Sequence, residues 1–224
     1  GKLDYRRFED ALQQVINRHE ALRTSFHSIN GEPVQRVHQS VELEILYKEA
    51  SIDQVDQLVH EFIQNFDLEV APLLRVGLIK IEEERHFFLM DMHHIVSDGV
   101  SAGILFEEFA KLYRGESLPE LRIQYKDFAV WQNELFASDA FNKQESYWIN
   151  TFAGEIPVLN LPTDHSRPTV QSFDGDQVVF HTGKQVMEDL YKLANETSTT
   201  LYMVLLAAFN VLLSKYSGQE ELVI

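Results

Sequence analysis

The alternation of apolar and polar residues along the chain predicts a mixture of helices and strands. Between residues 3 and 19, apolar residues recur at helical spacing and define one buried stripe. The extended runs 22–29 and 33–37 flank Asn30-Gly31, a strong sequence signal for a β-hairpin. Further strands are predicted at 43–47, 73–81 and 85–95, and further helices at 51–66, 101–113, 124–136 and 140–152.

The pattern changes in the last third of the chain. Residues 153–171 contain three prolines among few periodic apolar positions, which is typical of a linker. Residues 176–181 then resemble a strand and residues 201–216 a largely buried helix. We therefore predict an α/β (α+β mixed) fold in which helices flank a mixed sheet, with a break near residue 165. The first residues lie inside a helical pattern and the last, 221–224, begin a strand, so we expect a piece of a longer polypeptide.

Composition and charge exclude several classes of function. The chain has 19 Lys and Arg against 35 Asp and Glu, a net charge of −16. This sign is wrong for binding a nucleic acid backbone or an anionic membrane, which require clustered cations. There is no cysteine, so disulfides, thiolate metal sites and cysteine nucleophiles are excluded. The absence of cysteine also fits a reducing cytoplasm, which is the expected location. The longest apolar stretch is shorter than a membrane span, and no signal-peptide pattern is present.

The segment 87–99 carries the candidate chemistry. If residues 85–95 form one strand, His94 shares an apolar face with a phenylalanine and two methionines, while His93 falls with Asp91 on the other face. Burial on an apolar face favours the neutral, basic form of an imidazole, which suits a general base. Gly99 permits a sharp turn after the strand.

The helix predicted after this turn would present backbone N–H groups to a developing negative charge. The same residues also allow simpler interpretations. Adjacent histidines are compatible with a packed histidine beside a solvated one, and Asp98 with an ordinary turn or cap residue. A metal site is disfavoured because neighbouring side chains on a strand point apart, whereas metal ligands must converge.

Four motifs resemble those of one family. Residues 93–99, His-His-Ile-Val-Ser-Asp-Gly, match the His-His-x-x-x-Asp-Gly signature of condensation domains in nonribosomal peptide synthetases, which chloramphenicol acetyltransferase and related acyl-coenzyme A transferases share. Residues 18–26 resemble the family's Arg-His-Glu-x-Leu-Arg-Thr-x-Phe motif. Residues 125–132 resemble its Tyr-x-Asp-Phe/Tyr-Ala-x-Trp motif, and residues 161–168 the segment that joins its two lobes. The four occur in family order, and the resemblance covers essentially the whole chain.

The resemblance implies a chloramphenicol acetyltransferase-like fold of two lobes with a tunnel between them. Residues 1–165 would form the N-terminal lobe without its first strand. Residues 166–224 would form the linker and the incomplete beginning of the C-terminal lobe. Because catalysis requires both substrates to be held at attack distance, we expect the truncated chain alone to be inactive.

The resemblance also implies roles for individual residues. His94 corresponds to the catalytic histidine, which helps the amine of an acceptor aminoacyl group attack a donor thioester, either as a base or by orienting the amine. His93 would be a positioning residue. Asp98 would pair with Arg23 and hold the turn, and Gly99 would help to shape the tunnel. Three aromatic residues, Tyr125, Trp131 and Trp148, are expected to pack rather than react.

Substrates and partners follow from the same resemblance. No metal and no permanently bound cofactor is expected, because both acyl groups arrive on 4′-phosphopantetheine arms. The expected partners are the upstream and downstream peptidyl carrier protein domains and an adenylation domain of the same polypeptide, in a synthetase of antibiotics or other secondary metabolites.

Alternatives remain at this stage. An epimerization domain shares the fold and the two histidines, although residues 99–102 fit a condensation domain better. A non-catalytic fragment that binds carrier proteins is a second alternative. A heterocyclization domain lacks support because its Asp-rich signature is missing. A glycerolipid acyltransferase, using His93 and Asp98, would bring apolar membrane segments that this sequence lacks.

Overall fold

The computed structural model describes residues 1–172 and 175–224 and divides the chain into two units, Gly1–Phe141 and Asn142–Ile224. The break predicted near residue 165 falls inside the second unit. The assignment of residues 1–165 and 166–224 to two lobes therefore stays a prediction.

A mixed three-stranded sheet organises the first unit. The strand β3 (Ile45–Glu49) pairs in parallel with β4 (Leu74–Glu82), which pairs antiparallel with β5 (Arg85–Met92). The strand β4 is thus central, and it supplies most of the buried strand residues. This arrangement confirms the predicted mixed sheet, although β5 is three residues shorter than expected.

The predicted hairpin is present as a separate pair of strands. The strand β1 (Thr24–Ile29) pairs antiparallel with β2 (Glu32–Val37). Asn30 and Gly31 form the turn with φ of +55° and +86°. Two successive left-handed residues give the turn whose twist matches the flanking strands, which is why Asn-Gly predicted it.

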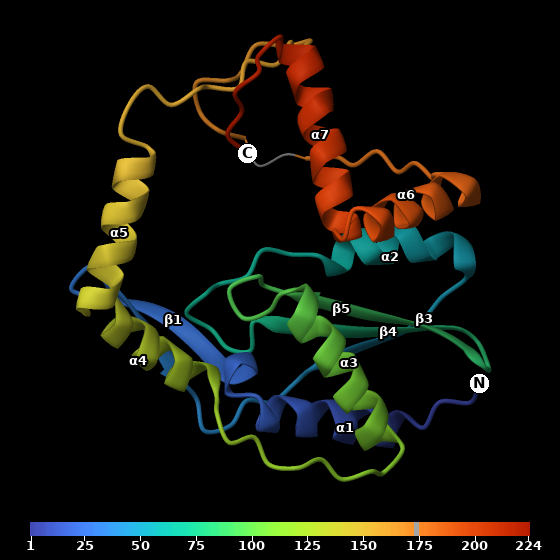
Figure 1. Ribbon diagram of the computed structural model, residues 1–224. Helices are drawn as coiled ribbons and strands as arrows, with labels where there is room; N and C mark the ends of the chain where they lie inside the picture. Colours follow the sequence, from blue (N-terminus) through green and yellow to red (C-terminus); the bar gives the residue numbers. More distant parts are fainter. Residues whose placement is uncertain (173–174) are drawn as a thin grey trace. The chain divides into compact units, whose positions relative to one another are not determined.

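Helices cover both faces of the β3–β4–β5 sheet (Figure 1). On one face, α1 (Tyr5–Arg18) and α3 (Gly99–Tyr113) pack against alternate residues of β4. On the other face, α2 (Val55–Phe62) places Phe62 against Gly77 of β4. Each apolar side chain that is fully buried contributes about 1.5–3 kcal/mol. The core of buried side chains between α1, β4 and α3 is Phe8, Leu12, Val15, Ile16, Leu22, Leu74, Val76, Leu78 and Leu105.

The remaining elements are short turns and peripheral helices. They are the 3₁₀ turns η1 (Glu20–Arg23) and η2 (Ile52–Gln54), and the helices α4 (Tyr125–Phe136), α5 (Asp139–Thr151), α6 (Lys184–Glu196) and α7 (Leu201–Ser217). The predicted helix 51–66 is shorter than expected, because it begins as the 3₁₀ turn η2 and α2 ends at Phe62 with an extended residue at Ile63.

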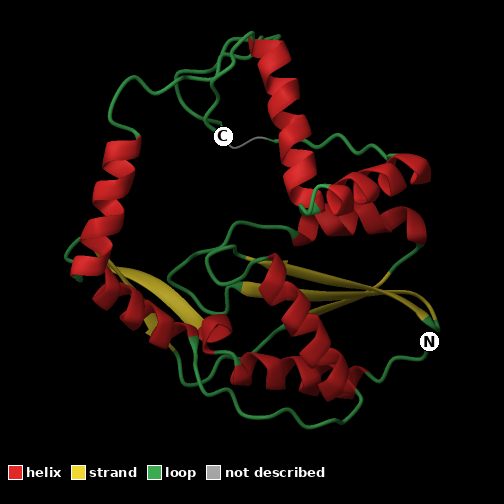
Figure 2. Cartoon of the chain, viewed as in Figure 1, coloured by secondary structure: helices red, strands yellow, loops and turns green. Residues whose placement is uncertain are grey.

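Three expectations for the second unit are wrong. Residues 176–181 and 221–224 are neither strand nor helix (Figure 2). No strand lies among the described residues of this unit, so the apolar runs have no partner with which to form a ladder. The helix α7 is largely exposed rather than buried, since only Leu213 of its side chains is buried. The helix α6 packs against α7, but most of the apolar side chains of α7 remain exposed.

No single helix among residues 1–172 and 175–224 is long and apolar enough to cross a membrane. The helices α6 and α7 reach that length only together, across a bend of 106°.

Candidate active site

The turn between β5 and α3 carries the predicted signature. The ladder of β5 ends at Met92, and the His93 N–H makes a last bond to the Leu73 carbonyl at 3.1 Å. The chain then turns, with the Val96 N–H donating to the His93 carbonyl at 3.1 Å. The strand predicted over 85–95 therefore stops before His94.

The expected burial of His94 is wrong. Its side chain is exposed, because the turn begins one residue before it and ends the alternation that would have placed it on the apolar face. His93 does fall on the same side of the sheet as Asp91, as predicted. The apolar environment expected around the His94 side chain is consequently absent from this chain.

His94 instead lines a cavity of about 390 Å³. The walls come from η1, the β1–β2 hairpin, the turn after β5, the N-terminus of α3 and the start of α4. They mix apolar and hydrogen-bonding side chains: Ala21, Thr24, Phe26, Gln35, His94, Ile95, Val96, Ser97, Asp98, Ser101 and Tyr125. A larger cavity of about 720 Å³ lies beneath residues 114–124 and contains none of the predicted site residues.

Asp98 caps helix α3. Its Oδ1 accepts the Ser101 N–H at 2.7 Å and the Ser101 hydroxyl at 2.6 Å, and the Asp98 N–H donates back to Ser101 Oγ at 2.7 Å. The Ser101 hydroxyl, then its N–H, lower the pKa of the Asp98 carboxyl, and a smaller electrostatic effect of His94 acts in the same direction. The carboxylate therefore stays ionised beside His94.

The same cap occupies part of the helix N-terminus, which the sequence predicted to face a developing negative charge. The Ser101 N–H is bound to the Asp98 carboxylate, and the Ala102 N–H is bound to the Asp98 carbonyl at 2.9 Å. These two groups are not free to donate to a substrate oxygen. Gly99 begins α3, and a Cβ there would meet open space, so the turn does not depend on the conformational freedom of glycine.

The predicted ion pair between Arg23 and Asp98 is wrong. Both residues lie in the described part of the chain, and no ion pair joins them there. Arg23 Nη1 donates to the His38 carbonyl at the end of β2, and Nη2 lies 3.8 Å from Glu20 Oε1. Asp98 instead caps its own helix through Oδ1.

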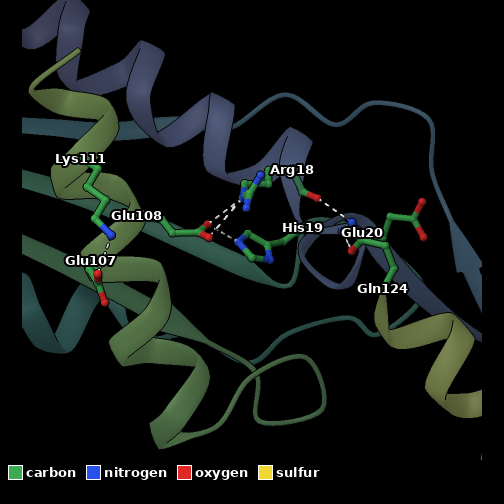
Figure 3. Close-up of polar contacts among 7 residues, drawn as sticks. All are labelled: Arg18, His19, Glu20, Glu107, Glu108, Lys111 and Gln124. Atoms are coloured by element: carbon green, nitrogen blue, oxygen red, sulfur yellow. Dashed lines mark hydrogen bonds and ion pairs between the residues drawn. The ribbon is translucent and has the colours of Figure 1, made fainter. Parts of the chain in front are cut away.

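The Arg-His-Glu motif binds three elements together, which the sequence did not indicate (Figure 3). Arg18 Nε donates to both carboxylate oxygens of Glu108 on α3, at 3.1 and 3.2 Å. His19 Nε2 lies 2.6 Å from Glu108 Oε2. On the other side, Glu20 accepts from Lys126 Nζ of α4 at 2.8 Å. The motif therefore fixes α3 and α4, two walls of the cavity, to the end of α1.

A Gln124 bridge completes this connection. Its amide donates to the Arg18 carbonyl at 2.9 Å and its Oε1 accepts the Glu20 N–H at 3.1 Å (Figure 3). The hydrophobic periodicity could not predict the contacts of Glu108 and Gln124, because each is a single polar residue in a segment whose pattern suggests exposure to solvent.

The three aromatic residues expected to pack are largely exposed. Tyr125, Trp131 and Trp148 are 55%, 53% and 55% exposed. Tyr125, at the start of α4, lines the cavity beside Asp98. Helical spacing aligned Tyr125, Phe128 and Trp131 on one side of α4, but their contacts are mainly with each other.

Among the described residues, no cluster of three or more His, Asp or Glu side chains is arranged to hold a metal ion.

Comparison with known proteins gives one consistent family. The model of the "Condensation domain" family matches residues 1–224. The chain is 67% identical over 224 residues to Gramicidin S synthase 2 of Aneurinibacillus migulanus and 62% identical to Tyrocidine synthase 3 of Brevibacillus parabrevis. All of this chain is aligned in each case, but it spans only 5% and 4% of those proteins.

Solved structures share the fold. The X-domain from teicoplanin biosynthesis is 26% identical with a TM-score of 0.85, over 96% of this chain and 50% of that one. The condensation domain of the Monacolin K polyketide synthase is 21% identical with a TM-score of 0.84, over 98% of this chain and 53% of that one. The epimerization domain from the third module of tyrocidine synthetase B is 24% identical with a TM-score of 0.83, over 97% and 52%. These likenesses confirm the predicted chloramphenicol acetyltransferase-like α/β fold.

Proposed function

The chain belongs to the condensation-domain family, as a segment of the kind found in nonribosomal peptide synthetases, and from this premise we propose that it supplies the histidine-bearing wall of an amide-forming site. The substrates would be two acyl groups, each held as a thioester on the phosphopantetheine arm of a carrier protein. Such arms are the way in which this family of synthetases carries its intermediates.

The reaction is acyl transfer from sulfur to nitrogen. The amine nitrogen of the acceptor aminoacyl group attacks the carbonyl carbon of the donor thioester, so a C–N bond forms and the C–S bond breaks. The amine loses a proton, and the departing pantetheine sulfur takes one up. Because α-amines are largely protonated near pH 7, some group must accept or redirect that proton.

The observation that carries the proposal is the place of His94 on the cavity wall. The exposed imidazole can reach a group bound in the 390 Å³ cavity, and histidine is the side chain that changes protonation state near neutral pH. We propose that His94 contacts the acceptor amine, as its base or as the group that orients it. Asp98, whose bonds to Ser101 lower the pKa of its carboxyl, lies on the same cavity wall as His94 and places a negative charge there.

The other predicted residues take supporting roles. His93 and Asp98 hold the two ends of the turn around His94, through the bonds of His93 to Leu73 and of Asp98 to Ser101. Gly99 leaves open space above the start of α3. Arg23 fixes the end of β2, and with it the hairpin wall of the cavity, by binding the His38 carbonyl.

The proposed partners follow from the relatives, which are multidomain synthetases. We propose an upstream and a downstream peptidyl carrier protein domain and an adenylation domain on the same polypeptide. No permanently bound cofactor takes part in the proposed reaction.

The test is amide formation by the intact polypeptide that carries residues 1–224, with defined aminoacyl groups loaded on both carriers. His94→Ala should lower the rate of amide formation by roughly 10²–10⁴-fold, which is the usual contribution of a positioned acid or base. Thioester loading should be unchanged. His60→Ala is the matched control, since His60 is an exposed imidazole on α2, away from the cavity.

Amide formation by His94→Ala at the wild-type rate would contradict the proposal. The stereochemistry of the donor residue is measured in the same products. Inversion of the donor without any amide would identify an epimerization domain instead.

A further inference from the structure

A cluster of four side chains lies next to the turn that carries His94. It is on the face of the β3–β4–β5 sheet opposite the core that packs against α1 and α3. We call it the Arg75 cluster, and it consists of Phe66, Arg75, Asp91 and His93. Among the described residues that line the cavity, none belongs to this cluster. Any effect of the cluster on a substrate must therefore pass through the turn.

Arg75 is the centre of the cluster. It stands opposite Asp91 in the β4–β5 ladder, and its Nη1 donates to Asp91 Oδ2 at 3.0 Å. The guanidinium also binds the carbonyls of Gln64 and Asn65, the latter at 2.7 Å. These bonds hold the segment after α2 against the sheet. A planar guanidinium can make several such bonds at once, which an ammonium group cannot do.

Phe66 connects the guanidinium to His93. The Arg75 guanidinium carbon lies 3.7 Å from the centroid of the Phe66 ring, a cation–π contact. The same ring contacts the His93 imidazole in a T-shaped pair, with 6.0 Å between the ring centroids and an interplanar angle of 86°. Edge-to-face geometry is the favoured arrangement for aromatic pairs, so the Phe66 ring restricts the orientation of the imidazole.

The orientation of the His93 imidazole determines the backbone of the turn. His93 Nδ1 accepts a hydrogen bond from the Ile95 N–H at 3.0 Å. This bond spans His94, and the His93 N–H is itself bound to the Leu73 carbonyl. His94, which lines the cavity, is thus held on its N-terminal and its C-terminal side by hydrogen bonds of His93. The bond also requires Nδ1 to be unprotonated, so a neutral His93 carries its proton on Nε2.

We propose that Arg75 and Phe66 are positioning residues for His94, and that they act by holding the His93 imidazole in the orientation and tautomer that accept the Ile95 N–H. This inference rests on the proposed function for its effect on catalysis. Its structural part, the control of His93 by Phe66 and Arg75, stands independently of any reaction.

The first measurement reads the His93 ring directly. In the full chain labelled with ¹⁵N-histidine, two-bond ¹H–¹⁵N correlation spectra report the protonation of each ring nitrogen, and His93→Gln identifies the signal. The wild type should show Nδ1 unprotonated and Nε2 protonated. Phe66→Leu and Arg75→Lys should change this signal toward a mixture of tautomers. Phe66→Tyr, which keeps the aromatic ring, should retain the wild-type signal.

The second measurement is amide formation by the intact polypeptide. Phe66→Leu and Arg75→Lys should lower kcat by roughly 10–100-fold with little change in KM for the acceptor carrier, because a small displacement of a reacting group affects the rate more than binding. The matched control is Tyr47→Leu. Tyr47 is a partly exposed residue of β3 that forms an edge-to-face pair with Tyr5 of α1, and it does not line the cavity. It should leave both the His93 signal and kcat unchanged.

Three results would overturn the inference: an unchanged His93 signal in folded Phe66→Leu and Arg75→Lys, a changed signal with unchanged kcat, or a loss of kcat with an unchanged signal. If Phe66→Leu does not fold, Arg75→Lys and Phe66→Tyr decide the matter. If the wild type forms no amide, the proposed function fails, and the NMR measurement alone still decides whether Phe66 and Arg75 control His93.

Discussion

Removal of the Glu108 carboxylate should destabilise the first unit far more than removal of its neighbour Glu107. In Glu108→Ala, Arg18 and His19 lose their shared partner on α3. The three side chains are only 16%, 19% and 13% exposed for Arg18, His19 and Glu108, so water cannot fully replace the lost contacts. The Arg18 guanidinium and the His19 imidazole would then lie side by side without the Glu108 carboxylate that accepts from both of them.

The magnitude follows from this burial. A hydrogen bond to a charged group contributes about 1.5–3 kcal/mol, and breaking a buried ion pair costs about 3–5 kcal/mol. Because the Glu108 site is partly exposed, we expect a loss of about 2–4 kcal/mol in the free energy of unfolding. Glu108→Gln keeps an acceptor for Arg18 but removes the charge, so its effect should lie between those of the wild type and Glu108→Ala.

The assay is urea unfolding, with stability taken from the midpoint at constant slope. Fluorescence of Trp131 in a Trp148→Phe background reports on the first unit alone. The matched control is Glu107→Ala, which breaks the exposed pair of Glu107 and Lys111 on the same helix (Figure 3). Exposed pairs of this kind contribute little, so the control should match the wild type. Equal stabilities of Glu108→Ala and Glu107→Ala would refute the reasoning.

Two further predictions concern the cap of α3 and the centre of the sheet. The lowered pKa of Asp98 means that its ionised form contributes stability above the unfolded pKa, which is lost as the pH falls through the folded pKa. Asp98→Asn should therefore show a weaker fall in urea midpoint between roughly pH 5 and pH 2 than the wild type, and parallel profiles would contradict this assignment. Gly77→Ala should destabilise the first unit by about 1–3 kcal/mol, because the new Cβ would lie 3.1 Å from Phe62 Cε2 and 3.4 Å from Leu89 Cβ, and an unchanged urea midpoint would show that the Phe62 ring can move aside.

Local signals predicted local structure well. The Asn30-Gly31 turn needed only two left-handed residues, and the helix 5–18 needed only its own apolar stripe, so both could be read from adjacent residues. The placement of His93 with Asp91 followed from the alternation of β5, which continues one residue past the end of the strand through the bond of the His93 N–H to the Leu73 carbonyl. The motif 93–99 identified the family, which the comparison with known proteins confirmed.

Long-range pairing could not be predicted in the same way. The apolar pattern of β5 continues through Ile95, but the strand ends at Met92. The ladder with β4 stops there, and only the bond of the His93 N–H to the Leu73 carbonyl follows it. The burial of His94 was wrong for this reason. The predicted ion pair of Arg23 and Asp98 was wrong because Arg23 binds the His38 carbonyl and lies beside Glu20, whereas Asp98 caps α3, and no local pattern distinguishes these contacts from the predicted pair. Glu108 and the Arg75 cluster depend on contacts between segments whose proximity no local pattern reveals.

The span of the Arg18–Glu20 contacts along the chain has a consequence for synthesis on the ribosome. Arg18 and Glu20 reach partners that lie 90 and 106 positions later in the chain, at Glu108 and Lys126. At about 5–20 residues per second, translation needs roughly 5–20 s to produce that intervening stretch. The helix α1 therefore emerges well before its partners on α3 and α4, so Arg18 and Glu20 are without Glu108 and Lys126 during that interval.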